Sequence, residues 1–167
     1  MITMGIDPGY ERLGLAVIRT SAGKKDELLY STCLITAKTK PFHERLKQLA
    51  DGVEKILSKY QPDTLAIEEL FFSGNQKTAM KVSEARGMII YLAIRAGIKI
   101  INLTPLQVKM SITGFGRADK TQVSSMVGKL IRLPVGKHLD DEIDAIAIAI
   151  AGVVHARQEL IHTRAKQ

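Results

Sequence analysis

Residues 2–9 read ITMGIDPG, an apolar run that ends in an aspartate and a Pro-Gly turn. A short apolar run closed by turn residues predicts a buried β-strand, with Asp7 at its carboxyl end. A carboxylate in that position is costly to desolvate unless another group pairs with it. The first strand therefore brings a charge to the edge of the core, where it needs a partner.

Three more acidic residues stand next to apolar segments further along the chain. Glu68 follows the run at 64–67, whereas Asp141 and Asp144 precede the alternating run AIAIAI at 145–150. Carboxylates gathered by folding suggest a divalent cation, because hard cations such as Mg²⁺ prefer oxygen ligands and often share them with substrate phosphates.

The periodicity of the rest of the chain predicts an α/β domain. The first third reads as three strands joined by short turns, as in an antiparallel meander, at 2–6, 14–18 and 28–36. Two further strands are predicted at 65–70 and 98–103. Helices are predicted from Pro41 to Tyr60, over 75–96, from Thr104 onward, over 120–131, and from Asp140 or Asp141 to about Ala156. This order predicts a five-stranded mixed sheet flanked by helices.

The composition is that of one globular domain, which we assign to residues 1–156, with a polar tail at 157–167. The chain has 167 residues, of which 46% are hydrophobic, so it can bury a substantial core. Its longest apolar stretch, 87–94, is too short to span a bilayer, and its beginning does not resemble a signal peptide. The single cysteine, Cys33, cannot form an intrachain disulfide. These features favour a cytoplasmic protein without a membrane partner.

The charge balance points to a substrate class. The formal net charge is +7, and the basic residues are spread along the chain instead of forming a tail. A basic surface neutralises phosphates, which is the main source of affinity for nucleic acids. An acidic metal pocket on a basic protein therefore suggests a phosphodiester substrate.

The four acids can be placed at one edge of the predicted sheet. Asp141 and Asp144 are three positions apart on a predicted helix, so they share one face with about 5–6 Å between their Cβ atoms. Asp7 and Glu68 end strands, and sites collect at that edge of α/β sheets. If the two strands are neighbours, the acids can hold two Mg²⁺ about 3.5–4 Å apart. Taken singly, each acid could instead be a turn residue, a solvent-facing strand end or a helix N-terminus.

The order of short motifs along the chain is more specific than any one of them. They read GIDPG at 5–9, AIEELFF at 66–72, N at 75 with TA at 78–79 and ARG at 85–87, TP at 104–105 with VK at 108–109, GFGRADKTQV at 114–123, and DD at 140–141 with DAIAIA at 144–149. In this order, over nearly its whole length, the chain resembles the RuvC family of bacterial Holliday junction resolvases, within the retroviral-integrase and ribonuclease H-like superfamily.

The resemblance implies a ribonuclease H-like fold and a homodimeric, Mg²⁺-dependent endodeoxyribonuclease that makes paired nicks in four-way DNA junctions during recombination and repair. By position, Asp7, Glu68, Asp141 and Asp144 match the family's catalytic, metal-binding acids, with two Mg²⁺ expected per site and Mn²⁺ expected to substitute. The products would carry 5′-phosphate and 3′-hydroxyl ends. The branch-migration proteins RuvA and RuvB are the expected protein partners. Independently, the nearly all-apolar segment 88–94 favours a dimer, because such a helix must be covered on more than one side.

The resemblance also implies aromatic and amide contacts with DNA. Phe71 matches an aromatic residue that stacks on an unpaired base near the crossover, a contact typically worth about 1–3 kcal/mol. Phe72 either shares this role or belongs to the core, since neighbouring strand residues point opposite ways. Asn75 matches a residue near the DNA at the start of the dimer helix.

Three basic residues complete the expected DNA contacts. Lys109 and Lys120 match residues that contact phosphate near the scissile bond, and Arg117 adds a cation to the loop at 114–120. Without the resemblance, the same lysines would be interpreted as solvated surface residues.

Three further residues, Glu142, Glu69 and His138, lie near the four acids in the sequence. Helical phase should turn Glu142 away from the acid cluster, and strand alternation should turn Glu69 from the pocket. His138 lies near the site, outside the predicted helix. The group that activates the water is left open among His138, Lys120 and the metal alone.

Three other functions were weighed against junction cleavage. A junction-binding module without cleavage would lack at least one of the acids, and all four are present. A sugar-kinase or actin-like ATPase would need two such domains and a second phosphate loop. A nuclease acting on ribosomal RNA precursors is the nearest enzymatic rival, and the paired phenylalanines, the apolar helix and the basic loop favour the junction over it.

Overall fold

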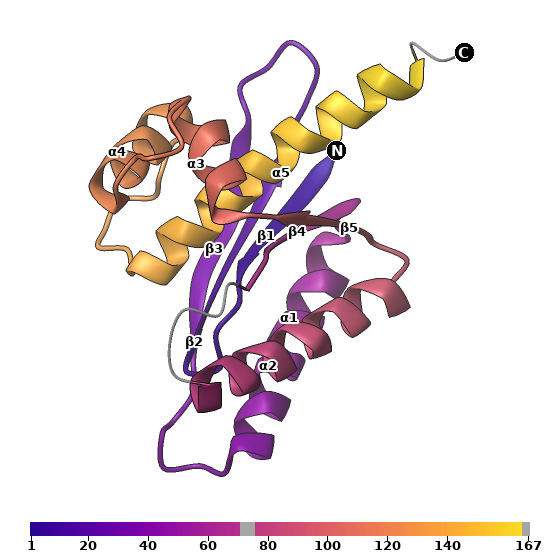
Figure 1. Ribbon diagram of the computed structural model, residues 1–167. Helices are drawn as coiled ribbons and strands as arrows, with labels where there is room; N and C mark the ends of the chain where they lie inside the picture. The colour runs from indigo at the N-terminus through magenta and orange to yellow at the C-terminus, as the bar shows by residue number, and fades with distance from the viewer. Residues whose placement is uncertain (71–75, 165–167) are drawn as a thin grey trace.

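The structure, a computed structural model, describes residues 1–70 and 76–164 (Figure 1). All the predicted strands and helices are present. Their bounds, in chain order, are β1 (Ile2–Asp7), β2 (Arg12–Arg19), β3 (Glu27–Ile35), α1 (Phe42–Tyr60), β4 (Thr64–Glu68), α2 (Gln76–Arg95), β5 (Lys99–Leu103), α3 (Pro105–Thr113), α4 (Lys120–Leu130) and α5 (Asp140–Arg164).

The five strands form one mixed sheet, as predicted, and the structure shows their order to be β3-β2-β1-β4-β5. The meander accounts for its antiparallel half, in which β1 pairs with β2 and β2 with β3. β4 runs parallel to both β1 and β5. β1 and β4 are therefore neighbours with the same direction, and their carboxyl ends meet at one edge.

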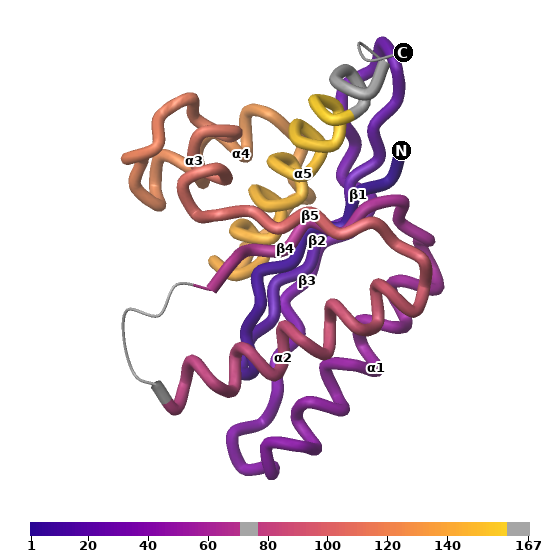
Figure 2. Tube along the Cα trace, turned by 45° about the vertical axis from the view of Figure 1, so that its right-hand side comes forward, coloured from indigo at the N-terminus to yellow at the C-terminus, as the bar shows by residue number. Residues whose placement is uncertain are grey.

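Helices cover both faces of the sheet, in three layers (Figures 1 and 2). α1 and α2 lie on one face, and α3, α4 and α5 lie on the other. Strand alternation divides the core accordingly: Met4 and Ile6 of β1 pack toward α1 and α2, whereas Ala16 and Ala66 pack toward α5. Two hydrophobic clusters, one on each side, hold the domain together.

α5 lies unusually close to the sheet because two glycines of the strands face it. A Cβ atom added to Gly14 would lie 1.8 Å from the carbonyl oxygen of Asp141, and one added to Gly5 would lie 2.3 Å from the backbone nitrogen of Ala149. Any side chain at these positions would push the helix away. The glycines thus fix how near the first turns of α5 come to β1 and β2.

The predicted end of the last helix is wrong. α5 continues past Ala156 to Arg164. The sequence after Ala156 contains neither Gly nor Pro to stop a helix, and two ion pairs link this part of α5 to the sheet side of the domain. Arg157 Nη2 lies 3.0 Å from Asp26 Oδ1, and Lys99 pairs with Glu159.

α2 buries one face and exposes another. Ile89, Leu92 and Ala93 are buried against α1 and the sheet. Tyr91 and Ile94, on the opposite side, are 60% and 63% exposed. None of the described helices is long and apolar enough to cross a membrane.

Candidate active site

Asp7 and Glu68 come together because they end two parallel neighbouring strands. Asp7 is the last residue of β1 and Glu68 the last of β4. Alternation along each strand puts Asp7 on the same side as Gly5, which faces α5, and Glu68 on the same side as Ala66. Both carboxylates therefore lie on the face of the sheet that α5 covers.

The start of α5 brings the other acids to the same place. Asp7, Glu68 and Asp144 line a pocket of about 220 Å³, together with Lys109 of α3 and Lys120 of α4. Asp141 is not part of this lining, but its charge acts on both Asp7 and Asp144. The structure thus gathers the four predicted acids into one electrostatic cluster.

Burial and mutual repulsion make these carboxylates hard to ionise. Burial, followed by the charges of Asp144, Glu68 and Asp141, raises the pKa of Asp7 to about 7. Burial and the charge of Asp144 also raise the pKa of Glu68. The pKa of Asp144 is raised chiefly by burial, and the neighbouring Lys120 opposes the increase. Such a cluster stabilises any cation that enters it.

Lys120 supplies positive charge to this cluster. Its Nζ lies 3.1 Å from Asp144 Oδ2 and 3.4 Å from Asp140 Oδ2. Its own burial lowers the pKa of Lys120, but the hydrogen bonds and charges of Asp144 and Asp140 raise it overall. Lys109 has a smaller influence, lowering the pKa of Glu68. The ammonium of Lys120 is therefore engaged with carboxylates in this structure.

Asp141 has a separate partner at the rim. Arg12, the first residue of β2, places Nη1 3.4 Å from Asp141 Oδ2. The side chain of Asp141 is 25% exposed, so it lies between the pocket and solvent. The proximity of α5 to Gly14 holds the backbone of Asp141 directly over β2.

The donor set suits a hard cation that is only partly enclosed by protein. Among residues 1–70 and 76–164, no three carboxylate, imidazole or thiol groups converge closely enough to hold a metal by themselves. Mg²⁺ commonly binds one or two carboxylates and completes its shell with waters and substrate phosphates. The raised pKa of Asp7 indicates that the nearby positive charge does not offset its burial and the repulsion from the other acids. A bound cation would stabilise the ionised carboxylate, which supports such a site.

The expected DNA-contacting residues fall into two groups. Lys109 and Lys120 line the acid pocket, and Arg117 is exposed on the loop between α3 and α4. The remaining three expected contacts lie outside the residues that the structure describes, namely the side chains of Phe71, Phe72 and Asn75.

Glu142 points away from the acid cluster, as predicted. Glu142 accepts a hydrogen bond from Ser31 Oγ at 2.5 Å, on the β3 side of α5. His138 places Nδ1 3.2 Å from Glu142 Oε1 and Nε2 3.0 Å from the carbonyl oxygen of Pro134. The Pro134 hydrogen bond raises the pKa of His138, with Glu142 adding to the increase. This histidine ties the α4–α5 loop to α5.

Sequence reasoning missed two arginines that support the site. Arg86 of α2 donates from Nε to the carbonyl oxygen of Glu68 at 3.0 Å and also contacts Asn102 of β5. It belongs to the ARG motif at 85–87, which was the available signal. Arg12 has no comparable signal, because its partner Asp141 is 129 positions away.

Comparison with known proteins gives the family. Residues 3–152 match the family model described as crossover junction endodeoxyribonuclease RuvC. A protein of that name from Ruminiclostridium cellulolyticum is 44% identical over 150 residues, covering 90% of each chain. Another, from Caldicellulosiruptor saccharolyticus, is 42% identical over 160 residues, covering 96% of each.

Solved structures agree with the sequence matches. T. thermophilus RuvC in complex with Holliday junction substrate superposes with a TM-score of 0.88 at 33% identity, covering 95% of this chain and 96% of that one. The yeast mitochondrial Holliday junction resolvase Ydc2 shares the fold, with a TM-score of 0.65 at 14% identity, covering 89% of this chain and 76% of that one. The sheet order, the flanking helices and these matches together show that this chain belongs to the RuvC family of crossover junction endodeoxyribonucleases.

Proposed function

We propose that this protein is a structure-selective endonuclease that resolves four-way DNA junctions by metal-dependent hydrolysis. One observation carries the proposal: carboxylates from β1, β4 and α5 share a pocket with two lysines, in a chain of this family. The carboxylates provide oxygen ligands for a divalent cation, and the lysines provide charge for a phosphodiester.

The roles of the residues follow from their positions. Asp7, Glu68, Asp141 and Asp144 would hold Mg²⁺, with Mn²⁺ as a substitute. When bound, two Mg²⁺ supply an activated water and stabilise the leaving oxygen. Hydrolysis joins a water oxygen to phosphorus and breaks the bond to the 3′ oxygen, which leaves 5′-phosphate and 3′-hydroxyl ends.

The two lysines bind phosphate in this proposal. Lys120 pairs with Asp144 and Asp140 and so neutralises part of their charge. When cations bind the carboxylates, the ammonium of Lys120 can instead donate a hydrogen bond to a phosphate oxygen in the same pocket. Lys109 also lines the pocket, and in this proposal it contacts the substrate from the α3 side.

The exposed face of α2 supports a homodimer. One stripe along α2 contains Met80, Gly87, Tyr91 and Ile94, at spacings of seven, four and three. The three large apolar side chains in this stripe are each at least 60% exposed. Apart from its chain neighbours and the backbone of its own helix, no atom of residues 1–70 or 76–164 lies within 4 Å of the position that a Cβ of Gly87 would take, so this side of the helix is open to a close neighbour. A second copy of α2 would cover the stripe and give two acid pockets for two opposing strands.

The wider assembly follows from the same proposal. Contacts with junction DNA would come from Phe71, Phe72, Asn75, Lys109, Arg117 and Lys120, aided by the net charge of +7. The protein would work in the cytoplasm, in recombination and repair, with RuvA and RuvB holding and moving the junction.

The test compares the wild type with Asp7→Asn on three substrates in Mg²⁺: a synthetic four-way junction, a linear duplex and an RNA–DNA hybrid. The variant is expected to bind the junction and to lose cleavage, because one ligand carboxylate is gone while the basic surface remains. Asp51→Asn, which changes an exposed acid of α1 paired with Lys47, is the control and should cut normally. Full cleavage by Asp7→Asn, or a wild-type preference for the hybrid, would contradict the proposal.

A further inference from the structure

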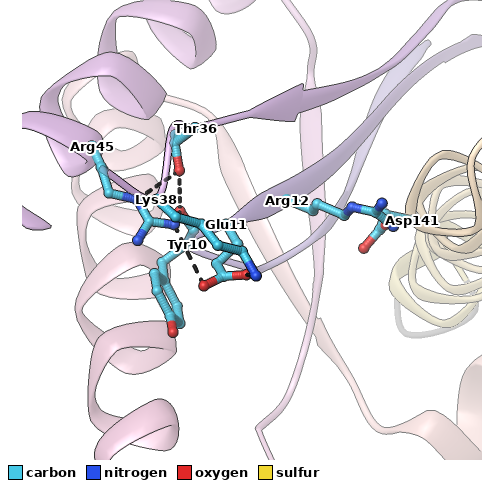
Figure 3. A network of polar contacts seen from close by, with 7 residues as sticks. All are labelled: Tyr10, Glu11, Arg12, Thr36, Lys38, Arg45 and Asp141. Carbon is cyan, nitrogen blue, oxygen red and sulfur yellow. Dashed lines mark hydrogen bonds and ion pairs between the residues drawn. The ribbon is translucent and has the colours of Figure 1, made fainter. Parts of the chain in front are cut away.

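A buried arginine holds the turn that follows Asp7. Arg45 of α1 is 5% exposed. Its Nε donates to Thr36 Oγ1 at 2.9 Å, and its Nη2 donates to the carbonyl oxygen of Tyr10 at 3.3 Å. Thr36 Oγ1 donates in turn to the same carbonyl oxygen at 2.8 Å. Figure 3 shows these groups converging between α1 and the β1–β2 turn.

Further contacts surround the same guanidinium. It stacks over the Tyr10 ring with 4.8 Å to the centroid, and its Nη2 lies 3.8 Å from Glu11 Oε1. Lys38 holds the other oxygen of Glu11 at 3.1 Å, and the backbone nitrogen of Thr36 donates to the Glu11 carbonyl oxygen at 3.0 Å. Tyr10 and Glu11, the centre of the turn, are thus fixed through both backbone and side chains.

This turn connects Asp7, a member of the acid cluster, with Arg12, the partner of another member. It starts after Asp7, the end of β1, and ends at Arg12, the start of β2. Arg12 reaches across to Asp141, with 3.4 Å between Nη1 and Oδ2, as Figure 3 also shows. The network around Arg45 therefore sets the place of Arg12, and Arg12 restrains the carboxylate of Asp141.

We propose that Arg12 and Arg45 are positioning residues for the cleavage reaction: Arg45 fixes the turn, and Arg12 orients Asp141. The inference rests on the proposed function, in which Asp141 is a metal ligand. Arg12 itself is 54% exposed, so its ion pair with Asp141 contributes little to stability. Its effect is geometric, and geometry matters for a ligand because small displacements in a catalytic site can cost orders of magnitude in rate.

β2 supplies a matched control at its other end. Arg19 is 50% exposed and pairs with Glu27 at 3.3 Å, whereas Arg12 is 54% exposed and pairs with Asp141 at 3.4 Å. The two arginines lie on the same strand, have similar exposed fractions and each pair with a carboxylate. They differ in that only the partner of Arg12 belongs to the acid cluster.

The experiment measures junction cleavage and junction binding for Arg12→Met, Arg12→Lys and Arg19→Met. Arg12→Met is expected to lower kcat about tenfold or more, with KM and metal-free junction binding within about twofold of wild type. Arg12→Lys should recover part of the loss, and Arg19→Met should match wild type. The carboxyl-carbon NMR shift of Asp141 in metal-free protein should move in Arg12→Met and stay unchanged in Arg19→Met.

Three outcomes distinguish the proposed function, the positioning role of Arg12 and a direct contact between Arg12 and DNA. If wild type and Arg19→Met do not cut the junction, the proposed function itself fails. If they cut and Arg12→Met cuts equally fast, the positioning role is wrong. If Arg12→Met loses junction binding tenfold, Arg12 is a DNA contact and the positioning role is again wrong.

Arg45 is tested by two variants of different severity. Arg45→Lys keeps the buried charge but loses the forked contacts, and Thr36→Val removes one partner while keeping the shape. Each is expected to lower kcat and shift the Asp141 carboxyl resonance with KM unchanged. If Thr36→Val or Arg45→Lys folds and retains both the wild-type kcat and the wild-type resonance, the turn does not position the site.

Discussion

Asp7 has a raised pKa because it is buried among other acids, and this makes the stability of the protein depend on pH. In the folded protein its pKa is about 7, against 3.8 for an unperturbed aspartate. Between these two values the folded state binds more protons than the unfolded state, so the free energy of unfolding falls as the pH rises from about 4 to 7. The full cost of ionising Asp7 is present above pH 7, unless a cation offsets it.

Asp7→Asn is therefore expected to stabilise the metal-free protein at pH 8 while abolishing cleavage. At about 1.4 kcal/mol per pKa unit, the gain in the free energy of unfolding should be roughly 2–4 kcal/mol, shrinking toward pH 4. Urea unfolding in EDTA across pH 4–8 measures it. The exposed-acid variant Asp51→Asn keeps Asp7, so it should show no gain in stability over wild type at any of these pH values. A wild type whose free energy of unfolding is flat from pH 5 to 8 would contradict the buried charge of Asp7.

Gly14 tests the closeness of α5 to β2. Gly14→Ala places a methyl group 1.8 Å from the Asp141 carbonyl oxygen, so the helix must shift. We expect a loss of about 3 kcal/mol in the free energy of unfolding, together with loss of cleavage. Gly128→Ala is the control, since among the described residues its Cβ would meet only Leu133 Cδ1 at 4.0 Å, and within α4 it should stabilise by about 0.5–1 kcal/mol. Equal stability of both variants would show that α5 can move without cost.

Individual acids could be placed from the sequence because each lies where a periodic segment begins or ends. These positions, such as the spacing of three between Asp141 and Asp144 and the apolar run before Asp7, made the acids candidates, and the family resemblance singled out the four. Arg12 and Arg45 were not predictable in this way, since their partners come from a distant helix and from turn carbonyls. A side chain that acts through another residue leaves no local pattern in the chain.

At the scale of whole elements, the exposed face of α2 gives the clearest prediction. Tyr91→Lys and Ile94→Lys, made together, place two charges in the stripe that a second copy would cover. The expected result is a change of mass in sedimentation from twice 18.4 kDa to 18.4 kDa, because buried lysines in a helix pair repel and lack partners.

The control for this change is Leu130→Lys. Leu130 is 43% exposed at the end of α4, across the sheet from α2. It should leave the mass and junction cleavage unaltered. A double variant of α2 that keeps the wild-type mass would show that this face is not the dimer interface.

Elements were easier to predict than their ends. Pro41, Gly97 and the Thr104-Pro105 pair mark helix boundaries, and the structure agrees with each: Thr104 caps α3 through a hydrogen bond from the Gln107 nitrogen, and Gly97 adopts a positive φ after α2. α5 was cut short in the prediction because its polar last turns carry no apolar stripe. A helical segment that is held by ion pairs shows no hydrophobic periodicity from which it could be predicted.

For the whole molecule, the proposed dimer would carry two acid pockets and therefore predicts paired nicks. A mixed dimer of one wild-type and one Asp7→Asn protomer should cut one strand only, since each pocket serves one strand. On a supercoiled plasmid with an extruded cruciform, wild type should yield linear product, whereas mixed dimers should yield nicked circles. A mixed dimer that linearises the plasmid at the wild-type rate would mean that one pocket serves both strands.

The docking of α5 against β1 and β2 has a consequence for how the protein is made. Asp7 and Glu68 leave the ribosome early, whereas Asp141 and Asp144 are synthesised more than 70 residues after Glu68. Contacts between the first strand and the last helix have a large sequence separation, and such contacts form late in folding. A nascent chain therefore carries half of the acids without the rest, and, with the roles proposed for these acids, cleavage is expected only after the final helix packs against the two glycines.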